Sequence, residues 1–213
     1  MASDLDGTLL NTIGDLAAAA NHTLAEMGFA PHTEEEYKYM VGNGIPKLIE
    51  RLTPEELRTE QVLADAYRDF DADYHDHMFD KTAPYPGMPE LLAALHAKGV
   101  RLAVFSNKDD ALARGVVAHY FDPSLFVQVR GAFADVPKKP APEGTLALME
   151  QIGADPAATL YVGDSNVDVA TAKNAGLPCC GVLWGFRTQE ELQQAGAEYL
   201  AATMQDLEKV ILQ

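Results

Sequence analysis

The apolar residues of this chain follow two patterns along its 213 residues, and the change between them falls near residue 83. Between residues 13 and 82, apolar side chains recur at steps of three and four, which is the period of amphipathic helices. After residue 83, short apolar runs alternate with stretches of helical period, which is typical of strands connected by helices. The first region is therefore expected to be all-helical, and the second is expected to contain a sheet.

Residues typical of helix ends divide the first region into segments. Helices are expected over 13–27, 33–41, 45–52 and 62–78. Gly28 ends the first helix, and Thr33-Glu34-Glu35-Glu36 has the order of a capping box at the start of the second. The sequence Thr53-Pro54-Glu55-Glu56 predicts one further helix start, because proline is favoured at the first position of a helix.

The second region predicts the fold class. Strands are expected at 101–105, 125–129, 159–163 and 178–183, with a short edge strand at 198–200, and helices are expected at 89–98, 109–120, 167–175, 189–195 and 204–212, with another ending at residue 152. This alternation predicts an α/β architecture with a doubly wound parallel sheet, a Rossmann-like core. The expected domains are this core, residues 1–12 and 83–213, and an inserted all-helical cap domain, residues 13–82, that would act as a lid.

Composition indicates which classes of partner and which cellular compartment are expected. The formal net charge of −16 disfavours nucleic acids and anionic membranes as partners, but it is compatible with a small anionic substrate at a metal-assisted site. The apolar runs are too short to span a membrane, and the N-terminus does not resemble a secretion signal. The adjacent Cys179 and Cys180 predict buried thiols in a reducing compartment. We therefore expect a cytoplasmic protein, monomeric or homodimeric, that acts on a small metabolite.

Two carboxylates lie two residues apart in Asp4-Leu5-Asp6-Gly7-Thr8-Leu9. If a strand leads into Asp4, the period of two points the Asp4 and Asp6 side chains the same way. Crowded carboxylates repel each other and normally need a cation or a shared proton. Such a pair can bind Mg2+, or one carboxylate can attack a substrate while the other moves protons. The alternative is an acidic turn that caps the helix after Thr12.

Further polar residues follow other predicted strands. Ser106 and Asn107 come after the strand at 101–105, and Asp164 comes after the strand at 159–163, with Asp168 four residues further on. Because parallel strands place their carboxyl ends at one edge of the sheet, where ligands bind, these residues are expected to lie together. Lys138-Lys139 could join them or could be a solvated charge pair. Each piece alone could be a helix cap, but their common edge indicates one site.

The chain resembles the haloacid dehalogenase-like hydrolases. The four motifs of that family match, in order, Asp4-Leu5-Asp6-Gly7-Thr8-Leu9, Ser106, Lys139-Pro140 and Gly163-Asp164 with Asp168. Within the family the chain is similar to the phosphoglycolate phosphatase-like branch, which has an α-helical cap. This finer likeness rests on Val41-Gly42-Asn43-Gly44-Ile45, Tyr85-Pro86-Gly87, Phe105-Ser106-Asn107-Lys108 and Trp184-Gly185-Phe186-Arg187-Thr188.

The resemblance implies a role for each motif residue. Asp4 would be the nucleophile, and Asp6 would be the general acid and then the general base. Ser106 and Lys139 would stabilise the transferring phosphoryl group. Mg2+ would be held by Asp4, by the backbone carbonyl of Asp6 and by Asp164. Asp168 would orient Lys139 or a water on the metal.

The resemblance also implies where the substrate is bound. Backbone amides around Gly7 and Thr8 would face the phosphoryl group. In the cap, Asn43 and Gly44 precede a helix whose N-terminus is suited to a substrate carboxylate. The secondary candidates for this carboxylate are Lys47, Asn107, Lys108 and Arg187.

The expected function is that of a Mg2+-dependent phosphatase that hydrolyses a small phosphomonoester through an aspartyl-phosphate, with 2-phosphoglycolate as the best guess. Alternatives within the family are a pyrophosphatase, a nucleotide or sugar phosphatase, or a phosphomutase. A catalytically silent binding protein is the alternative from another class. Carbon–halogen hydrolysis is disfavoured, because Asp6 suits a reaction that must protonate an alkoxide. Only Met1-Ala2-Ser3 precedes Asp4 here, so the first strand is expected to be short and its surroundings less stable.

Overall fold

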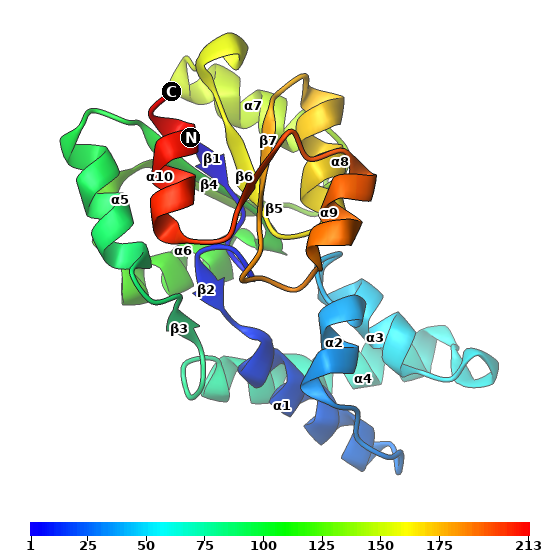
Figure 1. Ribbon diagram of the computed structural model, residues 1–213. Coiled ribbons are helices and arrows are strands. Elements are labelled where there is room, and N and C mark those ends of the chain that lie inside the picture. The colour runs from blue at the N-terminus through cyan, green and yellow to red at the C-terminus, as the bar shows by residue number, and fades with distance from the viewer. The chain divides into compact units, whose positions relative to one another are not determined.

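The computed structural model describes residues 1–213, and the chain divides into two compact units. The core unit comprises Met1–Leu10 and Pro84–Gln213, and the inserted unit comprises Asn11–Ala83. The colours of Figure 1 run from the amino to the carboxyl end and show that the inserted unit interrupts the core unit soon after its first strand. None of the helices combines the length and the apolar character that crossing a membrane requires.

The core unit contains a six-stranded sheet in which every neighbouring pair of strands is parallel. Its strands are β1 (Ala2–Ser3), β4 (Leu102–Asp109), β5 (Phe126–Ala132), β6 (Tyr161–Gly163), β7 (Cys179–Val182) and β8 (Tyr199–Ala201). Their spatial order is β5-β4-β1-β6-β7-β8, so β1 lies in the middle and the chain winds outward in both directions. The predicted doubly wound α/β core is confirmed.

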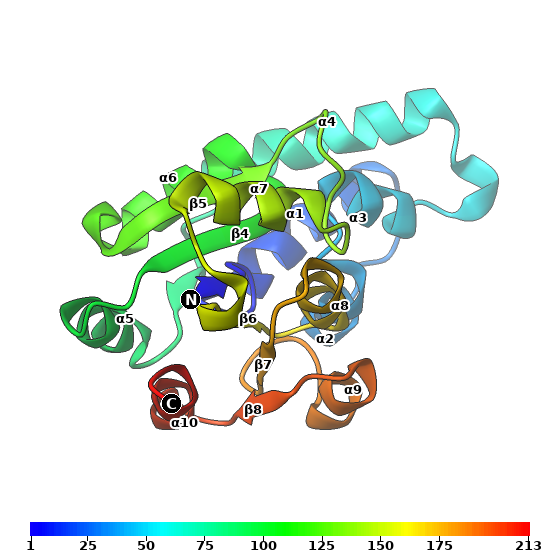
Figure 2. The ribbon, with the colours of Figure 1, turned by 90° about the horizontal axis from the view of Figure 1, so that it is seen from above.

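Helices cover both faces of this sheet, as the view from above shows (Figure 2). One face carries α5 (Met88–Ala97), α6 (Asp110–Tyr120) and α10 (Met204–Ile211), and the other carries α7 (Glu143–Ile152), α8 (Asn166–Ala175) and α9 (Gln189–Ala195). Short 3-10 turns, η2 (Pro123–Leu125) and η3 (Pro156–Ala158), precede β5 and β6. Because both faces are covered, Leu102, Ala103 and Val104 of β4 are all fully buried, which explains the continuous apolar run in the sequence.

Strand β1 is only two residues long, as its sequence predicts. Ala2 and Ser3 pair with Ala103 and Val104 of β4 on one side and with residues of β6 on the other. The amide of Asp4 continues this pairing by donating to the carbonyl oxygen of Val162 at 2.9 Å. The short strand therefore delivers Asp4 to the carboxyl edge of the sheet between its two longer neighbours.

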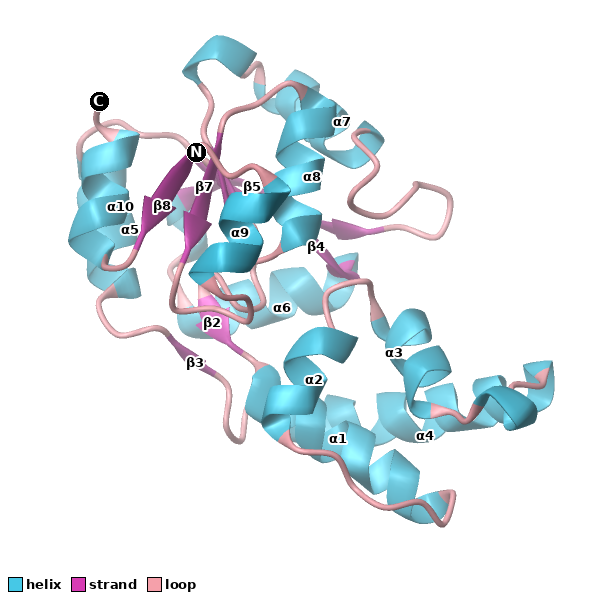
Figure 3. Cartoon of the chain, turned by 45° about the vertical axis from the view of Figure 1, so that its right-hand side comes forward, coloured by secondary structure: helices cyan, strands magenta, loops and turns pink.

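The inserted unit is helical, as the cyan ribbons of Figure 3 show. It consists of α1 (Ile13–Glu26), α2 (Glu34–Met40), α3 (Ile45–Leu52) and α4 (Glu60–His77), with the 3-10 turn η1 (Glu55–Leu57) between the last two. Helix α1 packs against α2 and α4, and α3 packs against α4. Tyr37, Leu48 and Phe70 are among its fully buried side chains.

Two details of the inserted segment differ from the sequence prediction. The helix expected from Thr53-Pro54 is only the turn η1, and α4 begins after Thr59, whose hydroxyl accepts from the amide of Val62. The two-residue strands β2 (Leu10–Asn11) and β3 (Ala83–Pro84), which form a sheet of their own, have no sequence signal because each is too short for a period.

Candidate active site

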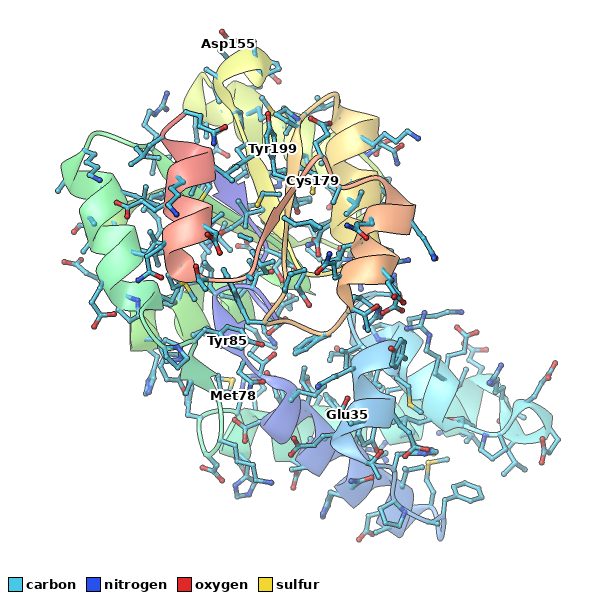
Figure 4. All side chains as sticks on the ribbon, in the orientation of Figure 1. Glu35, Met78, Tyr85, Asp155, Cys179 and Tyr199 are labelled. Atoms are coloured by element: carbon cyan, nitrogen blue, oxygen red, sulfur yellow. The ribbon has the colours of Figure 1, made fainter.

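The site is built at the carboxyl edge of the core sheet. Tyr85 and Asp155, labelled in Figure 4, lie at opposite ends of the core unit and mark the carboxyl and amino edges of the sheet. Strand β1 leads to Asp4 and β6 leads to Asp164, while Ser106 and Asn107 lie within β4. The sequence predicts that this last strand ends at Phe105, but β4 continues to Asp109 after a shift of its register against β5.

Lys139 joins two carboxylates at the centre of the site. Its Nζ lies 2.9 Å from Oδ1 of Asp4 and 2.8 Å from Oδ1 of Asp168. Burial acts to lower the pKa of Lys139, but the charges of Asp168 and Asp4 outweigh burial and raise it well above its usual range. Lys139 is therefore a permanent cation, and the amide of Leu5 donates a further hydrogen bond to Asp4 Oδ1 at 2.8 Å.

Asn107 anchors the backbone of Lys139. Its Oδ1 accepts from the Lys139 amide at 2.8 Å, and its Nδ2 donates to the Lys139 carbonyl oxygen at 3.2 Å. The Lys139-Pro140 peptide bond is cis. The reciprocal bonds attach the loop that carries the lysine to the strand that carries Ser106.

Asp164 is held from two directions. The hydroxyl of Thr8 donates to its Oδ1 at 3.0 Å, and the amide of Phe186 donates to its Oδ2 at 2.8 Å. Burial is the largest influence on this carboxyl, and it raises the pKa of Asp164 to about 7. Two glycines allow the close approach, because a Cβ at Gly7 or Gly185 would overlap the side chain of Asp164. Gly7 also has φ of 78°, a conformation that favours glycine.

Asp168 is fully buried at the start of α8. Its Oδ2 accepts from the amide of Ser165 at 3.1 Å and from the hydroxyl of Ser165 at 2.7 Å, while its Oδ1 is on Lys139. Both oxygens are thus engaged by protein donors, so Asp168 fixes the orientation of the Lys139 ammonium.

The three aspartates Asp4, Asp164 and Asp168 offer carboxylate oxygens within 4.8 Å of one another. With all three ionised, one buried lysine leaves two negative charges uncompensated. Burial accordingly raises the pKa of Asp4 well above its usual range, even though Lys139 acts to lower it. Hard oxygen ligands and a deficit of two positive charges are what a divalent cation such as Mg2+ requires, so the residues fit a metal.

Asp6 lies beside a second buried lysine. Its Oδ1 is 3.4 Å from Nζ of Lys108, whose side chain is 3% exposed while that of Asp6 is 20% exposed. The amide of Lys108 donates to the hydroxyl oxygen of Ser106 at 3.2 Å. Asp6 is therefore the more accessible of the two acidic residues in the first motif, and it borders a cation.

The remaining predicted residues have the following places. The prediction that the amides of Gly7 and Thr8 face the phosphoryl group is wrong, because they donate to the carbonyl oxygens of Leu10 at 2.8 Å and of Leu5 at 3.3 Å and so close the turn of the first motif. The hydroxyl of the fully buried Thr8 is directed to Asp164. Nη1 of Arg187 donates to the carbonyl oxygen of Phe186 at 3.2 Å. Asn43 and Gly44 belong to the inserted unit. There, Oδ1 of Asn43 accepts from Nη2 of Arg51 at 2.8 Å, and Gly44 caps α3 with φ of 84°.

Sequence reasoning missed two contributors to the site. Phe186 contributes a backbone amide, and Gly185 contributes by having no side chain. Neither residue type therefore indicates a role in the site when the sequence is considered alone. The only signal was the Trp184 to Thr188 segment, where Trp184 Nε1 donates to the carbonyl oxygen of Thr8 at 3.0 Å. That bond attaches the loop after β7 to the first motif.

Comparisons with known proteins identify the family of this chain. Residues 3–182 match the family model described as haloacid dehalogenase-like hydrolase. The phosphoglycolate phosphatase of Vibrio vulnificus strain YJ016 is 34% identical over 217 residues, covering all of this chain and 95% of that protein. A crystal structure from Lactobacillus delbrueckii subsp. bulgaricus, provisionally assigned as a phosphoglycolate phosphatase, has a TM-score of 0.92 and 31% identity, covering 99% of this chain and 96% of that one.

A further similar structure was solved with bound phosphate. CbbY from Rhodobacter sphaeroides, in complex with phosphate, has a TM-score of 0.78 and 25% identity, covering 97% of this chain and 94% of that one. Together, the match of the family model over most of the sequence and the full-length relative show that this chain belongs to the haloacid dehalogenase-like hydrolase family.

Proposed function

We propose that the protein is a Mg2+-dependent phosphoric monoester hydrolase that acts on a small phosphorylated metabolite, with 2-phosphoglycolate as its substrate. The observation that carries the proposal is the contact of Lys139 with Asp4 and Asp168 beside Asp164, with Asp6 two residues from Asp4. The full-length similarity to phosphoglycolate phosphatases supports the choice of substrate. The buried free thiols of Cys179 and Cys180 support a reducing, cytoplasmic setting.

In the first step, the Asp4 carboxylate attacks phosphorus and the bond from phosphorus to the leaving alkoxide oxygen breaks. Asp6 donates a proton to that oxygen, so the alcohol leaves neutral and an aspartyl-phosphate remains. In the second step, Asp6 takes a proton from water as the water attacks phosphorus. Inorganic phosphate is released and the Asp4 carboxylate is restored.

The other residues position these groups and stabilise charge. Lys139 and the Leu5 amide fix Asp4 Oδ1. Lys139 also offsets the charge of the phosphoryl group, to which Ser106 donates a hydrogen bond. Asp168 holds the lysine in place. In this way the site provides alignment and charge, which is most of what phosphoryl transfer needs.

Mg2+ would be held by Asp4, the backbone carbonyl of Asp6 and Asp164. When bound, the cation neutralises negative charge on the phosphoryl group and on the aspartates. Thr8 and the Phe186 amide keep the Asp164 carboxylate oriented for this purpose. These two donors act through Asp164 and need not touch the substrate.

The test is a phosphate-release assay on the purified protein with 2-phosphoglycolate, pyrophosphate, nucleotides and hexose phosphates, with Mg2+ and with a chelator. Turnover is expected to be fastest with 2-phosphoglycolate and to depend on Mg2+. Asp4→Asn is expected to lower kcat by at least about a thousandfold, because it removes the nucleophile. Lys138→Met, at an exposed lysine next to the site loop, is the matched control and is expected to keep full activity.

Two outcomes would contradict the proposal. Full turnover by the Asp4→Asn variant would show that Asp4 is not the nucleophile. Faster turnover of another ester in the panel would leave the phosphatase chemistry standing and would correct the substrate.

A further inference from the structure

Lys108 is the cation that borders the proton-transferring residue of the site. It lies on β4, its side chain is 3% exposed, and its Nζ is 3.4 Å from Asp6 Oδ1. Burying an ammonium group is unfavourable unless charged partners compensate for the lost water. A buried lysine beside a partly exposed carboxylate therefore places a positive charge where the leaving group would be bound.

The distances fit a particular leaving group. For Asp6 to protonate the leaving oxygen, one of its carboxyl oxygens must approach that oxygen to about 2.8 Å. If this is Oδ1, which is 3.4 Å from Lys108 Nζ, the ammonium lies no more than about 6 Å from the leaving oxygen. Ordinary bond lengths place a carboxylate oxygen on the adjacent carbon about 3 Å from the ester oxygen. A carboxylate in that position can reach Lys108 while its neighbouring oxygen receives the proton from Asp6.

The other cationic and amide candidates are engaged elsewhere. Lys139 is held by Asp4 and Asp168, and both amide atoms of Asn107 bind the backbone of Lys139. Nη1 of Arg187 donates to the carbonyl oxygen of Phe186. Lys47 belongs to the inserted unit, is 44% exposed and pairs with Glu50. Lys108 is the candidate whose side chain borders Asp6.

We propose that Lys108 binds the substrate carboxylate and selects phosphate esters of 2-hydroxy acids, in which the carbon next to the ester oxygen carries a carboxylate. This inference rests on the proposed function and deepens it, since it places a determinant of specificity in the core unit. A charge-assisted hydrogen bond to the carboxylate supplies the selection. An ester with a neutral group at that position leaves the buried ammonium without this partner and is bound less well.

The test compares two esters in the same variants. 2-Phosphoglycolate and ethyl phosphate have the same two-carbon leaving group, with a carboxylate in one and a methyl group in the other. Lys108→Met is expected to lower kcat/KM for 2-phosphoglycolate by about a hundredfold and that for ethyl phosphate by less than about threefold. Lys138→Met is the matched control and is expected to keep the wild-type ratio of the two esters. The ratio within one variant does not depend on how much of the sample is folded, and Lys108→Gln provides a second variant.

An equal loss for both esters, expressed in kcat, would mean that Lys108 only positions Asp6, and it would overturn the specificity proposal. Binding supplies a readout that needs no turnover. In the Asp4→Asn background with Mg2+, calorimetry is expected to show that Lys108→Met raises the Kd of 2-phosphoglycolate and leaves that of ethyl phosphate unchanged. If the wild type hydrolyses neither ester, the proposed function fails, but the calorimetric comparison still tests the role of Lys108. An unchanged Kd of 2-phosphoglycolate in the Lys108→Met variant would overturn the proposal that Lys108 binds its carboxylate.

Discussion

At the scale of single residues, two buried carboxylates of the site share one lysine as their counter-charge. Asp4 and Asp168 both contact Lys139, and all three groups are buried. Removing one partner of a buried ion pair is costly, because the remaining charge has neither water nor a counter-charge. The lysine therefore contributes to stability as well as to the proposed chemistry.

Lys139→Met tests this double contribution. The variant is expected to lose about 3 kcal/mol or more of unfolding free energy at about pH 8, since it leaves two buried carboxylates uncompensated. The loss should shrink at about pH 5, where Asp4, whose pKa burial raises, takes up a proton. Denaturant unfolding at the two pH values measures it, with Lys138→Met as the control. An equal loss at both pH values would speak against the charge argument.

The raised pKa of Asp164 predicts how metal binding depends on pH. Burial raises the folded-state pKa from 3.8 to about 7, so the contribution of this group to the stability of the metal-free protein is complete below about pH 4 and is lost as the pH rises through about 7. A cation needs the deprotonated form. The increase in Tm caused by Mg2+ is therefore expected to be larger at about pH 8 than at about pH 5.5.

Melting curves with Mg2+ and with a chelator at both pH values measure this difference. Asp164→Asn, which cannot titrate at this position, should remove most of the Mg2+ effect at the higher pH. A Mg2+ effect that is independent of pH would show that Asp164 is not a ligand.

At the scale of elements, the loop after β7 completes the site with backbone groups. Gly185 lies against both Asp164 and the carbonyl oxygen of Gly7, and the next residue donates its amide to Asp164. A side chain at residue 185 must displace one of these neighbours. The loop after β7 can pack against Asp164 only because residue 185 has no side chain.

Gly185→Ala is expected to weaken Mg2+-dependent turnover by at least about tenfold and to lower stability by about 1–3 kcal/mol, as overpacking does. Gly115→Ala is the matched control, because a Cβ there meets no atom within 4 Å and alanine is the better helix former in α6. Activity assays and thermal melts of both variants measure the contrast. Equal behaviour of the two variants would mean that the loop adjusts without cost.

The helices and strands also show how much of the fold the sequence predicts. The apolar runs predicted the parallel core, because strands buried on both faces keep a continuous apolar signal. The sequence predicts that β4 ends at Phe105, because Ser106 and Asn107 resemble a helix cap when they are considered without their partners, but the strand continues to Asp109. In the fold, Asn107 binds the backbone of Lys139 and Lys108 lies beside Asp6, and both partners are distant in sequence. Such long-range partners were visible only as a common strand edge, and the Phe186 amide was not visible at all.

At the scale of the whole molecule, the net charge of −16 contrasts with the chemistry of the site. A protein with this surplus of acid repels anions at long range, and salt screens that repulsion over about 10 Å. Binding of a phosphate ester is then expected to rely on groups at short range, which are the cations Lys139 and Lys108 and, when it is bound, the metal. Lys108 and Lys139 are both buried at the carboxyl edge of the sheet, so they place positive charge at the site of a protein whose net charge is negative.

The paired strands β2 and β3 make the protein modular. The chain leaves the core unit at Leu10 and returns at Pro84, and these two crossings lie on neighbouring strands, which are spaced about 5 Å apart. An insert of any size with closely spaced ends can join the core there without stretching it. A different insert with equally close ends could therefore be grafted onto the core unit at these two points.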